Sequence, residues 1–350
     1  MLENKNQDLT PISKLGEFGL IKHLTEHFPI VNSSTEVSIG DDAAVINPEG
    51  KKVVLSTDVL AEGVHFNLGY VPLKHLGYKS VVVNLSDIAA MNATPTQILV
   101  SIAVSNRFPV EALDEIYAGI QLACQHYKVD LVGGDTTSST SGLVISITAI
   151  GLEDDEKIVK RNGAKPNDLL VVTGDLGGAY FGLQILEREH AVYLANPDMQ
   201  PEMEGYDYVL ERQLKPEART DIKEKLKELD IKPTSMIDVS DGLASEILHL
   251  SDQSKVGFRL YDEKVPLDET AIMVADEFNL NPTMAALSGG EDYELLFTIS
   301  PNDYDKIKNH PDFTVIGYAV QKEEGNYMIL RGSGELSQIT AQGWDAFLNK

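Results

Sequence analysis

Short apolar runs rich in β-branched residues alternate with longer segments of helical period along this chain. This alternation restricts the fold more than any other feature of the sequence. In the first half, the run 143–151 has the pattern of a buried strand, whereas 74–91 and 110–127 have that of helices. The second half resumes with a strand at 169–173 and returns to one at 293–299. Strands interleaved with helices in both halves predict an α/β (α+β) fold.

A change in composition near the middle of the chain predicts two domains. The charged turn 153–157 is followed by the Gly- and Pro-containing stretch 161–166. At about 150 residues per domain, the length of 350 residues also favours two domains, which we place at 1–155 and 156–350. The other predicted strands are 52–56, 98–104, 235–238, 257–260, 313–320 and 327–330, and the other predicted helices are 13–28, 177–189, 216–229, 243–251, 269–278 and 302–309. The predicted apolar face of the first helix consists of Leu15, Phe18, Ile21, Leu24 and Phe28.

Charge and cysteine content narrow the possible functions. Lysines and arginines number 29 against 54 aspartates and glutamates, a net charge of −25, which argues against binding to the phosphate backbone of nucleic acids. Such a chain can bind polyanions only where a cation intervenes. The single cysteine, Cys124, excludes an intrachain disulfide and a zinc site built mainly from cysteines. Because the sequence has no run of about 18 apolar residues and no secretory signal, we expect a cytoplasmic protein with no membrane partner.

Aspartates lie at the ends of apolar runs or inside them, and this is the most informative pattern for function. Asp58 ends the run that begins at Val53, and Asp87 lies in an apolar helix beside Val83 and Ile88. A buried carboxylate is costly unless it is paired or binds a metal, and ligands that are all oxygens favour Mg²⁺. The alternative is that each aspartate caps a helix or forms a turn. The aspartates that show this pattern are Asp41, Asp42, Asp58, Asp87, Asp135, Asp238 and Asp241.

Glycine-rich turns adjoin three predicted strands, at 133–137, 174–178 and 288–294. Backbone N–H groups in such turns can bind phosphate oxygens, although an ordinary tight turn explains each one taken alone. None has the P-loop or the Rossmann pattern. Three further candidates are His65, which lies just past the strand that ends in Asp58, Arg161, which could reach a phosphate, and Trp344, which could stack on a planar ligand. Each of them could instead serve the structure alone.

Eight segments, taken in order along the chain, form a recognisable pattern. They are GEFGLI (16–21), GDDAAV (40–45), STD (56–58), NLSDIAAMNA (84–93), GGDTT (133–137), RNGAKPND (161–168), IDVSDGL (237–243) and LSGGEDYELLF (287–297). Together they resemble the thiamine-monophosphate kinase family over nearly the whole chain. The resemblance implies a two-domain architecture like that of aminoimidazole-ribonucleotide synthetase, with an N-terminal mixed-sheet domain that forms a homodimer through its sheet. It also implies that ATP and thiamine monophosphate react with several Mg²⁺ ions to give ADP and thiamine diphosphate, the last step of thiamine diphosphate biosynthesis.

The same resemblance implies a role for each residue that matches a family motif. No side chain is implied as a catalytic nucleophile or base, and residues 190–210 form a longer insertion than the resemblance leads us to expect. The implied metal ligands are Asp42, Ser56, Thr57, Asp58, Asp87, Asp135, Asp238 and Asp241. The implied ATP contacts are Tyr117, Gly134, Asp135, Arg161 and Ser240, and the implied substrate contacts are His65, Glu291 and Trp344.

Particular residues distinguish this family from other possible functions. Selenophosphate synthetase and the hydrogenase maturation factor use cysteines near a chain end, whereas this chain has only Cys124. Aminoimidazole-ribonucleotide synthetase would lack the arrangement GGEDYEL at 289–295. A non-catalytic acidic protein that binds metal or nucleotide is the alternative of another class, and an ATP turnover assay separates it from a kinase. For a kinase we expect direct in-line attack on the γ-phosphorus, with carboxylate-bound Mg²⁺ screening the two polyanions.

Overall fold

The computed structural model describes residues 9–40 and 43–340 of the chain. These form two compact units, the first comprising the described residues up to Ile88 and Ala93–Glu156, and the second Ala89–Asn92 and the described residues from Lys157 onward. The sequence places a boundary at 155/156, and the structure divides the chain at 156/157, with four residues near 90 added to the second unit. Helices and sheets occur in both units, which confirms the predicted fold class.

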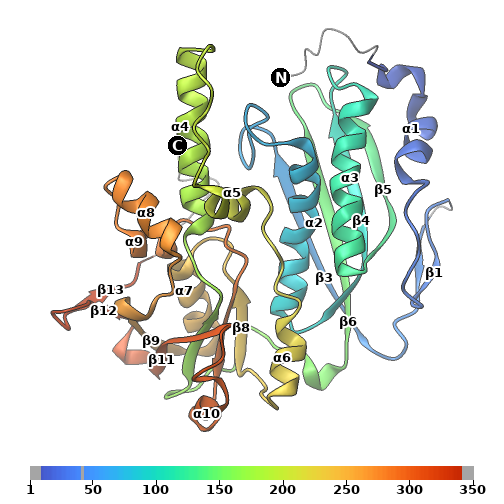
Figure 1. The fold of residues 1–350 in the computed structure, drawn as a ribbon. Helices are drawn as coiled ribbons and strands as arrows, with labels where there is room; N and C mark the ends of the chain where they lie inside the picture. The colour runs from blue at the N-terminus through green and yellow to red at the C-terminus, as the bar shows by residue number, and fades with distance from the viewer. Residues whose placement is uncertain (1–8, 41–42, 341–350) are drawn as a thin grey trace. The chain divides into compact units, whose positions relative to one another are not determined.

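The first unit is a four-stranded sheet covered on one face by two helices. Its strand order is β3-β6-β4-β5; β4 and β5 are parallel and the other pairs antiparallel, so the sheet is mixed. The two helices α2 and α3 lie side by side on this sheet (Figure 1). They approach closely because Gly77 and Gly119 lack side chains: a Cβ at either position would lie 1.9 Å from a backbone oxygen of the other helix. The bounds are β3 (Lys52–Ala61), β4 (Thr94–Val104), β5 (Asp130–Ser138), β6 (Val144–Glu153), α2 (Leu73–Ala90) and α3 (Val110–Tyr127).

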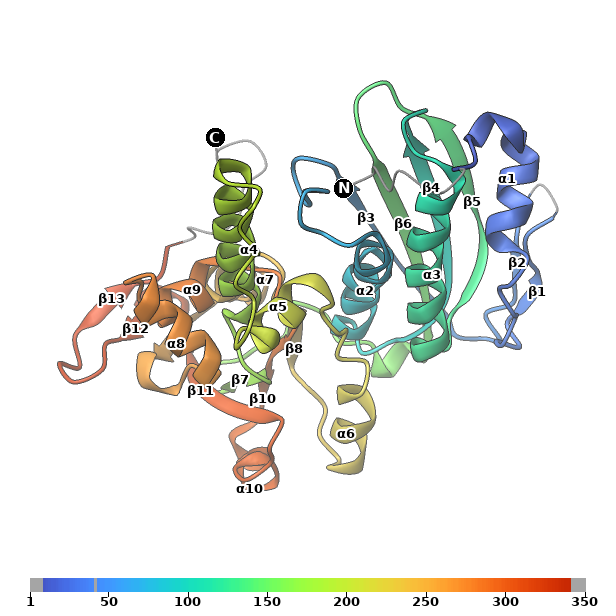
Figure 2. The same ribbon diagram turned by 45° about the horizontal axis from the view of Figure 1, so that its top comes forward.

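A smaller layer adjoins the β5 edge of this unit. Helix α1 (Gly16–Thr25) and the hairpin of β1 (Thr35–Val37) and β2 (Val45–Ile46) lie beside α3 and β5, as Figure 2 shows. Buried Asp130 fixes this layer, because its carboxylate accepts hydrogen bonds from the backbone N–H of Val31 (2.7 Å) and the hydroxyl of Thr35 (2.7 Å).

The second unit is a seven-stranded sheet with helices on both faces. The strand order is β13-β12-β9-β11-β7-β10-β8, and all pairs are antiparallel except β12 with β9. Neighbouring residues of one strand enter different cores: Val172 packs with residues of α7, whereas Val171 packs with Ile222 and Leu226 of α6. The strands are β7 (Leu169–Thr173), β8 (Ser235–Asp238), β9 (Val256–Tyr261), β10 (Leu295–Ile299), β11 (Phe313–Gln321), β12 (Tyr327–Ile329) and β13 (Leu336–Gln338).

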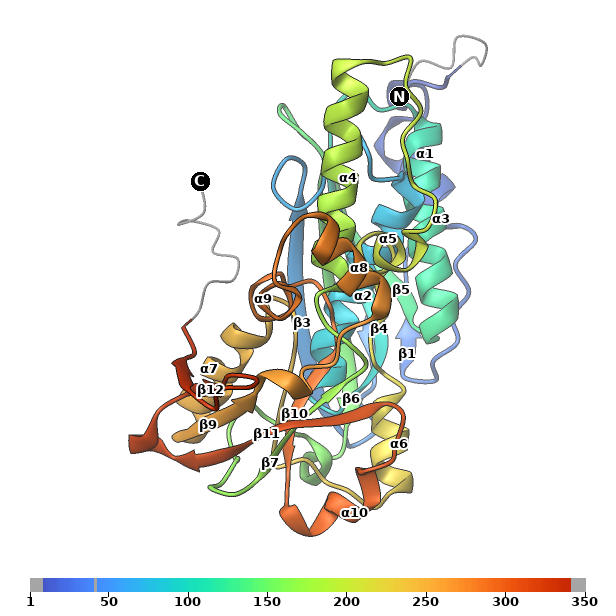
Figure 3. The same cartoon turned by 60° about the vertical axis from the view of Figure 1, so that its left-hand side comes forward.

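The helices of the second unit include one group that packs around α4. Figure 3 shows α5, α8 and α9 gathered along one half of α4, and their buried apolar side chains form one cluster. The helices are α4 (Gly178–Ala195), α5 (Asp207–Leu214), α6 (Ile222–Glu228), α7 (Leu243–Ser254), α8 (Glu269–Glu277), α9 (Pro282–Ser288) and α10 (Tyr304–Ile307). In the described part of the chain, no helix has the length and apolar character needed to cross a membrane.

Several sequence predictions differ from the structure. The helix predicted at 13–28 is shorter, and the apolar face assigned to it is wrong in part: Phe18 is 83% exposed, while Leu20 and Leu24 are buried. The helix predicted at 216–229 begins only at Ile222. Helix α4 extends beyond its prediction to Ala195, and α5 forms in a stretch for which no element is predicted. Strands β1, β2 and β13 and helix α9 are also absent from the prediction, and residues 133–137, predicted as a glycine-rich turn after a strand, lie inside strand β5.

Candidate functional site

One group of candidate residues forms where β3 faces α2. Ser56 and Asp58 are two residues apart on β3, so their side chains lie on the same face of the strand. The Ser56 hydroxyl donates a hydrogen bond to the Asp87 carboxylate on α2. The Asp58 backbone N–H donates to the Asn84 side chain, 2.9 Å away, and Asn84 lies about one turn before Asp87. The structure therefore brings the Ser56 and Asp87 side chains into contact and places half-buried Asp58 on the same face of β3; we call these three residues the Ser56–Asp58–Asp87 cluster.

Thr57 points to the opposite side of β3 from this cluster. Its hydroxyl donates to the Ile147 carbonyl (3.1 Å) and accepts from the Thr148 hydroxyl (3.1 Å). On this second face, the apolar side chains Val53, Leu55 and Val59 are 48%, 64% and 50% exposed. The Thr57 hydroxyl is therefore separated from the carboxylates with which the resemblance groups it.

Gly134 and Asp135 lie on β5, at the other edge of the same sheet. Strands β6 and β4 stand between β3 and β5, which at about 4.8 Å per strand spacing corresponds to about 14 Å along the sheet. Asp135 is exposed. Gly134 adopts φ +155°, and a Cβ on it would lie 1.8 Å from the Val100 carbonyl oxygen, so only glycine fits there. Within one copy of the chain, Asp135 is thus remote from the Ser56–Asp58–Asp87 cluster.

His65 and Tyr117 lie in contrasting environments. The exposed His65 ring accepts a hydrogen bond at Nδ1 from the Ala61 backbone N–H (3.1 Å), so a neutral ring carries its proton on Nε2. Glu62 holds this loop by binding Arg107 (2.5 Å) and the Leu143 backbone N–H (2.8 Å). Tyr117 is buried on α3, which raises the pKa of its hydroxyl to about 12.

The second unit collects a further group of candidates where β8 ends and β10 begins. The two segments pair through their backbones: Glu291 N–H donates to the Ser240 carbonyl (2.7 Å) and Tyr293 N–H to the Val239 carbonyl (2.9 Å). Gly290 makes this approach possible, because a Cβ there would lie 2.5 Å from the Ser240 carbonyl oxygen. Glu291 and Tyr293 have φ values of +58° and +53°. This pairing places Glu291 next to the segment that carries Asp238, Ser240 and Asp241.

The carboxyl groups of this second group are crowded. Asp238 is 2% exposed, and the Asp241 backbone N–H donates to the Glu246 carboxylate of α7 (3.1 Å). Burial, and then the neighbouring charge of Asp238, raises the pKa of Glu246 to about 8. Burial also raises the pKa of Asp241, while His249 and the exposed Arg161 oppose that rise. A further positive charge would therefore be favourable at this end of β8.

A network of buried charged groups binds the carboxylates of the Ser288–Glu294 segment. The Asp292 carboxylate accepts hydrogen bonds from the backbone N–H groups of Gly177 (2.8 Å) and Ala179 (3.5 Å). Arg212 lies 3.8 Å from Asp292 and 3.0 Å from Glu294. Burial raises the pKa of Asp292 to about 7. The glycine-rich turn at 174–178 thus binds an internal carboxylate.

The donor atoms available suit a hard cation such as Mg²⁺, since they are carboxylate and hydroxyl oxygens. Across residues 9–40 and 43–340, however, no three His, Cys, Asp or Glu side chains gather closely enough to form a metal site by themselves. The implied carboxylate ligands that the structure describes occur as separate groups: Asp58 and Asp87 near β3, Asp135 on β5, and Asp238 and Asp241 at the end of β8. Two implied residues, Asp42 and Trp344, lie outside the described residues.

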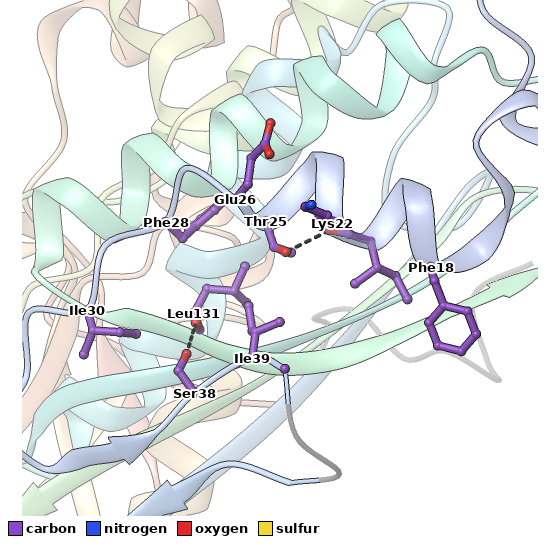
Figure 4. Close-up of a pocket in the computed structure, with 11 residues that line it drawn as sticks. Phe18, Lys22, Thr25, Glu26, Phe28, Ile30, Ser38, Ile39 and Leu131 are labelled. Atoms are coloured by element: carbon purple, nitrogen blue, oxygen red, sulfur yellow. Dashed lines mark hydrogen bonds between the residues drawn. The ribbon is translucent and has the colours of Figure 1, made fainter.

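A pocket of about 470 Å³ lies elsewhere in the first unit, between α1 and β5 (Figure 4). Phe18, Ile39 and Leu131 are among its apolar lining residues, and Lys22 and Glu26 are its charged ones. Among the residues that the structure describes, none of those that the resemblance assigns to metal, ATP or substrate lines it.

Comparison with known proteins identifies the family of this chain. Residues 40–152 match the family model for the N-terminal domain of AIR synthase related proteins. Thiamine-monophosphate kinase from Bacillus subtilis is 34% identical over 95% of this chain and 100% of its own length, and that from Aquifex aeolicus is 34% identical over 96% and 99%. A solved complex of AaThiL with AMPPCP and TMP has a TM-score of 0.72 at 30% identity, covering 97% of this chain and all of the other. This chain therefore belongs to the thiamine-monophosphate kinase family.

Proposed function

We propose that this chain transfers the γ-phosphate of ATP to thiamine monophosphate by direct in-line attack, and that the reaction requires Mg²⁺ and takes place in the cytoplasm. The observation that carries the proposal is the Ser56–Asp58–Asp87 cluster on β3 and α2 in a chain of this family. A solved relative is a complex with AMPPCP, an ATP analogue, and TMP, which supports the choice of both substrates.

The proposed metal ligands follow the resemblance, with one change suggested by the geometry. Thr57 would contribute its backbone oxygen, because its hydroxyl bonds to Ile147 and Thr148 on the far face of β3. When bound, Mg²⁺ would neutralise phosphate charge and bring two anionic substrates together. The proposed ligands are Asp42, Ser56, Thr57, Asp58, Asp87, Asp135, Asp238 and Asp241.

The chain's own residues would position the substrates. His65 would donate a hydrogen bond from Nε2–H to thiamine monophosphate, since its Nδ1 already accepts one from the backbone. The attacking group is a phosphate oxygen, which carries its own negative charge and needs no strong general base. The other proposed substrate contacts are Glu291 and Trp344, and the proposed ATP contacts are Tyr117, Gly134, Asp135, Arg161 and Ser240.

We also propose that the first unit forms a homodimer through its sheet. The outer face of β3 exposes Val53, Leu55 and Val59, an apolar stripe that a second copy would cover. Light scattering should give twice the mass of the chain for the wild type and a shift toward the single mass for Leu55→Asp. A wild-type monomer at micromolar concentration would contradict the proposal.

The experiment that tests the function is an assay of the purified protein with ATP, Mg²⁺ and thiamine monophosphate, in which thiamine diphosphate is measured. Free thiamine at matched concentration is the control acceptor, because its hydroxyl offers no charge to a metal and would need a base. We expect turnover of the monophosphate only. Comparable rates on both acceptors, or a product that stops at thiamine monophosphate, would overturn the proposal.

A further inference from the structure

Helix α5 contacts the Ser288–Glu294 segment through two consecutive side chains. The Gln213 side-chain amide donates a hydrogen bond to the Glu291 carboxylate (2.9 Å), and Gln213 is only 6% exposed. The guanidinium of Arg212 donates to the Glu294 carboxylate (3.0 Å) and to the Asp292 carbonyl (3.2 Å). One short helix thus binds both the side chain of Glu291 and the backbone that follows it.

The position of α5 is itself fixed by α4. Gly182 of α4 faces α5, and a Cβ there would lie 2.0 Å from the Val209 carbonyl oxygen and 2.8 Å from Cβ of Gln213. Val209 is fully buried in the cluster that joins the two helices. The packing of α5 against α4 therefore restricts the Gln213 side chain, so Gln213 loses less conformational entropy when it binds the Glu291 carboxylate.

Glu291 itself has an unusual backbone conformation, with φ +58°. Its N–H is bound to the Ser240 carbonyl, so β8 determines the position of the backbone, while the orientation of the side chain is set separately. Gln213 helps to set that orientation from helix α5, which lies outside the motifs at 237–243 and 287–297.

We propose that Gln213 is a positioning residue for thiamine monophosphate, which it serves by fixing the Glu291 carboxylate. The inference rests on the proposed function, in which Glu291 contacts that substrate. It gives a role to α5, part of the stretch between α4 and α6 that the family motifs leave without one. Gln213 itself touches no reacting atom.

A double-mutant cycle between Gln213→Met and Glu291→Ala tests this inference. Methionine keeps the length of the side chain but donates no hydrogen bond. Gln213→Met should raise KM for thiamine monophosphate about tenfold, a typical loss for a hydrogen bond to a charged group, and leave KM for ATP within about twofold. In the Glu291→Ala background, the same substitution should change KM for thiamine monophosphate by less than about twofold.

Val209→Ala is the matched control, because it loosens the packing of α5 without removing a group that contacts Glu291. Its effect should be the same with and without Glu291. An additive cycle for Gln213→Met, or an equal rise of both KM values, would refute the positioning role and leave the kinase function standing. Calorimetric titration with thiamine monophosphate in the absence of ATP provides the same cycle as binding constants. A wild type that forms no thiamine diphosphate from ATP and thiamine monophosphate would overturn the proposed function, and this inference with it.

Discussion

Replacing Arg212 by methionine should destabilise the second unit strongly, and by an amount that depends on pH. The Arg212 side chain is 15% exposed, and its partners Asp292 and Glu294 are 0% and 4% exposed. Removing one member of a buried ion pair costs about 3–5 kcal/mol. Glu294 keeps Arg219, which lies 2.6 Å away, so we expect the lower end, about 3 kcal/mol at pH 8.

The pH dependence follows from the raised pKa of Asp292, which is about 7 with Arg212 present. Arg212 lowers that pKa, so the variant should hold the Asp292 proton to still higher pH. An acid whose folded pKa is raised loses stability as pH rises from the unfolded value, about 4, to the folded one. In the variant this loss continues above pH 7. The difference in unfolding free energy between wild type and variant should therefore grow from pH 5.5 to pH 8.

Urea denaturation at the two pH values measures this difference. Lys227→Met is the control, because Lys227 pairs with Glu224 on the surface with 73% of its side chain exposed, and such pairs contribute about 1 kcal/mol at most. A loss for Arg212→Met that is equal at both pH values, or below about 1 kcal/mol at pH 8, would show that the buried carboxylates do not depend on this cation.

Three further predictions concern catalysis. Asp87→Asn should keep the fold, since an amide oxygen can still accept a hydrogen bond from Ser56. It should lower kcat/KM by about 100-fold or more, because losing even an outer-shell partner of a metal costs about 10–100-fold. Near-normal turnover with normal Mg²⁺ dependence would contradict the metal role. Cys124→Ser should leave turnover intact and cost about 1–3 kcal/mol of stability, because it buries a hydroxyl where the thiol is 5% exposed; a well-folded but inactive variant would instead indicate a thiol-dependent reaction. EDTA should abolish turnover reversibly, while circular dichroism should show both units still folded, since residues 9–40 and 43–340 contain no cluster of three metal-binding side chains on which the fold could depend. Activity that persists in EDTA would contradict the Mg²⁺ requirement.

Much of the fold can be predicted because single elements carry complete patterns. Helix α3 has the predicted bounds, and it buries an unbroken apolar stripe that includes Leu113, Ile116 and Ile120. Helix α1 shows where this reasoning fails. The predicted five-residue face correctly included the buried Leu24, but it also included the exposed Phe18 and missed the buried Leu20. The size of an apolar residue does not determine which side of a short helix meets the core.

Neither helix α5 nor its role could be predicted from the sequence pattern, for a related reason. Its buried residues are Val209 and Gln213, one apolar and one polar, so no apolar period marks it. Gln213 is buried because Glu291, 78 positions away, provides its hydrogen-bond partner. Such long-range pairing leaves no local signal. The sequence predicts that Asp87 is buried and binds a metal; the structure shows it half-buried and bound to the Ser56 hydroxyl, and its metal role stays a prediction.

The distribution of positive charge links the acidity of this chain to its proposed chemistry. Arg212 and Arg219 are bound to Glu294, and Arg219 also to Asp312, all within the second unit. These guanidinium groups serve carboxylates of the chain itself. For Asp87 and Asp135, in contrast, the structure shows no ion pair with any lysine or arginine among the residues it describes. Carboxylates left without an internal cation repel phosphate. They can contribute to binding ATP and thiamine monophosphate only if a metal cation joins them to the phosphates, so the charge pattern itself argues that the proposed Mg²⁺ is required for substrate binding as well as for catalysis.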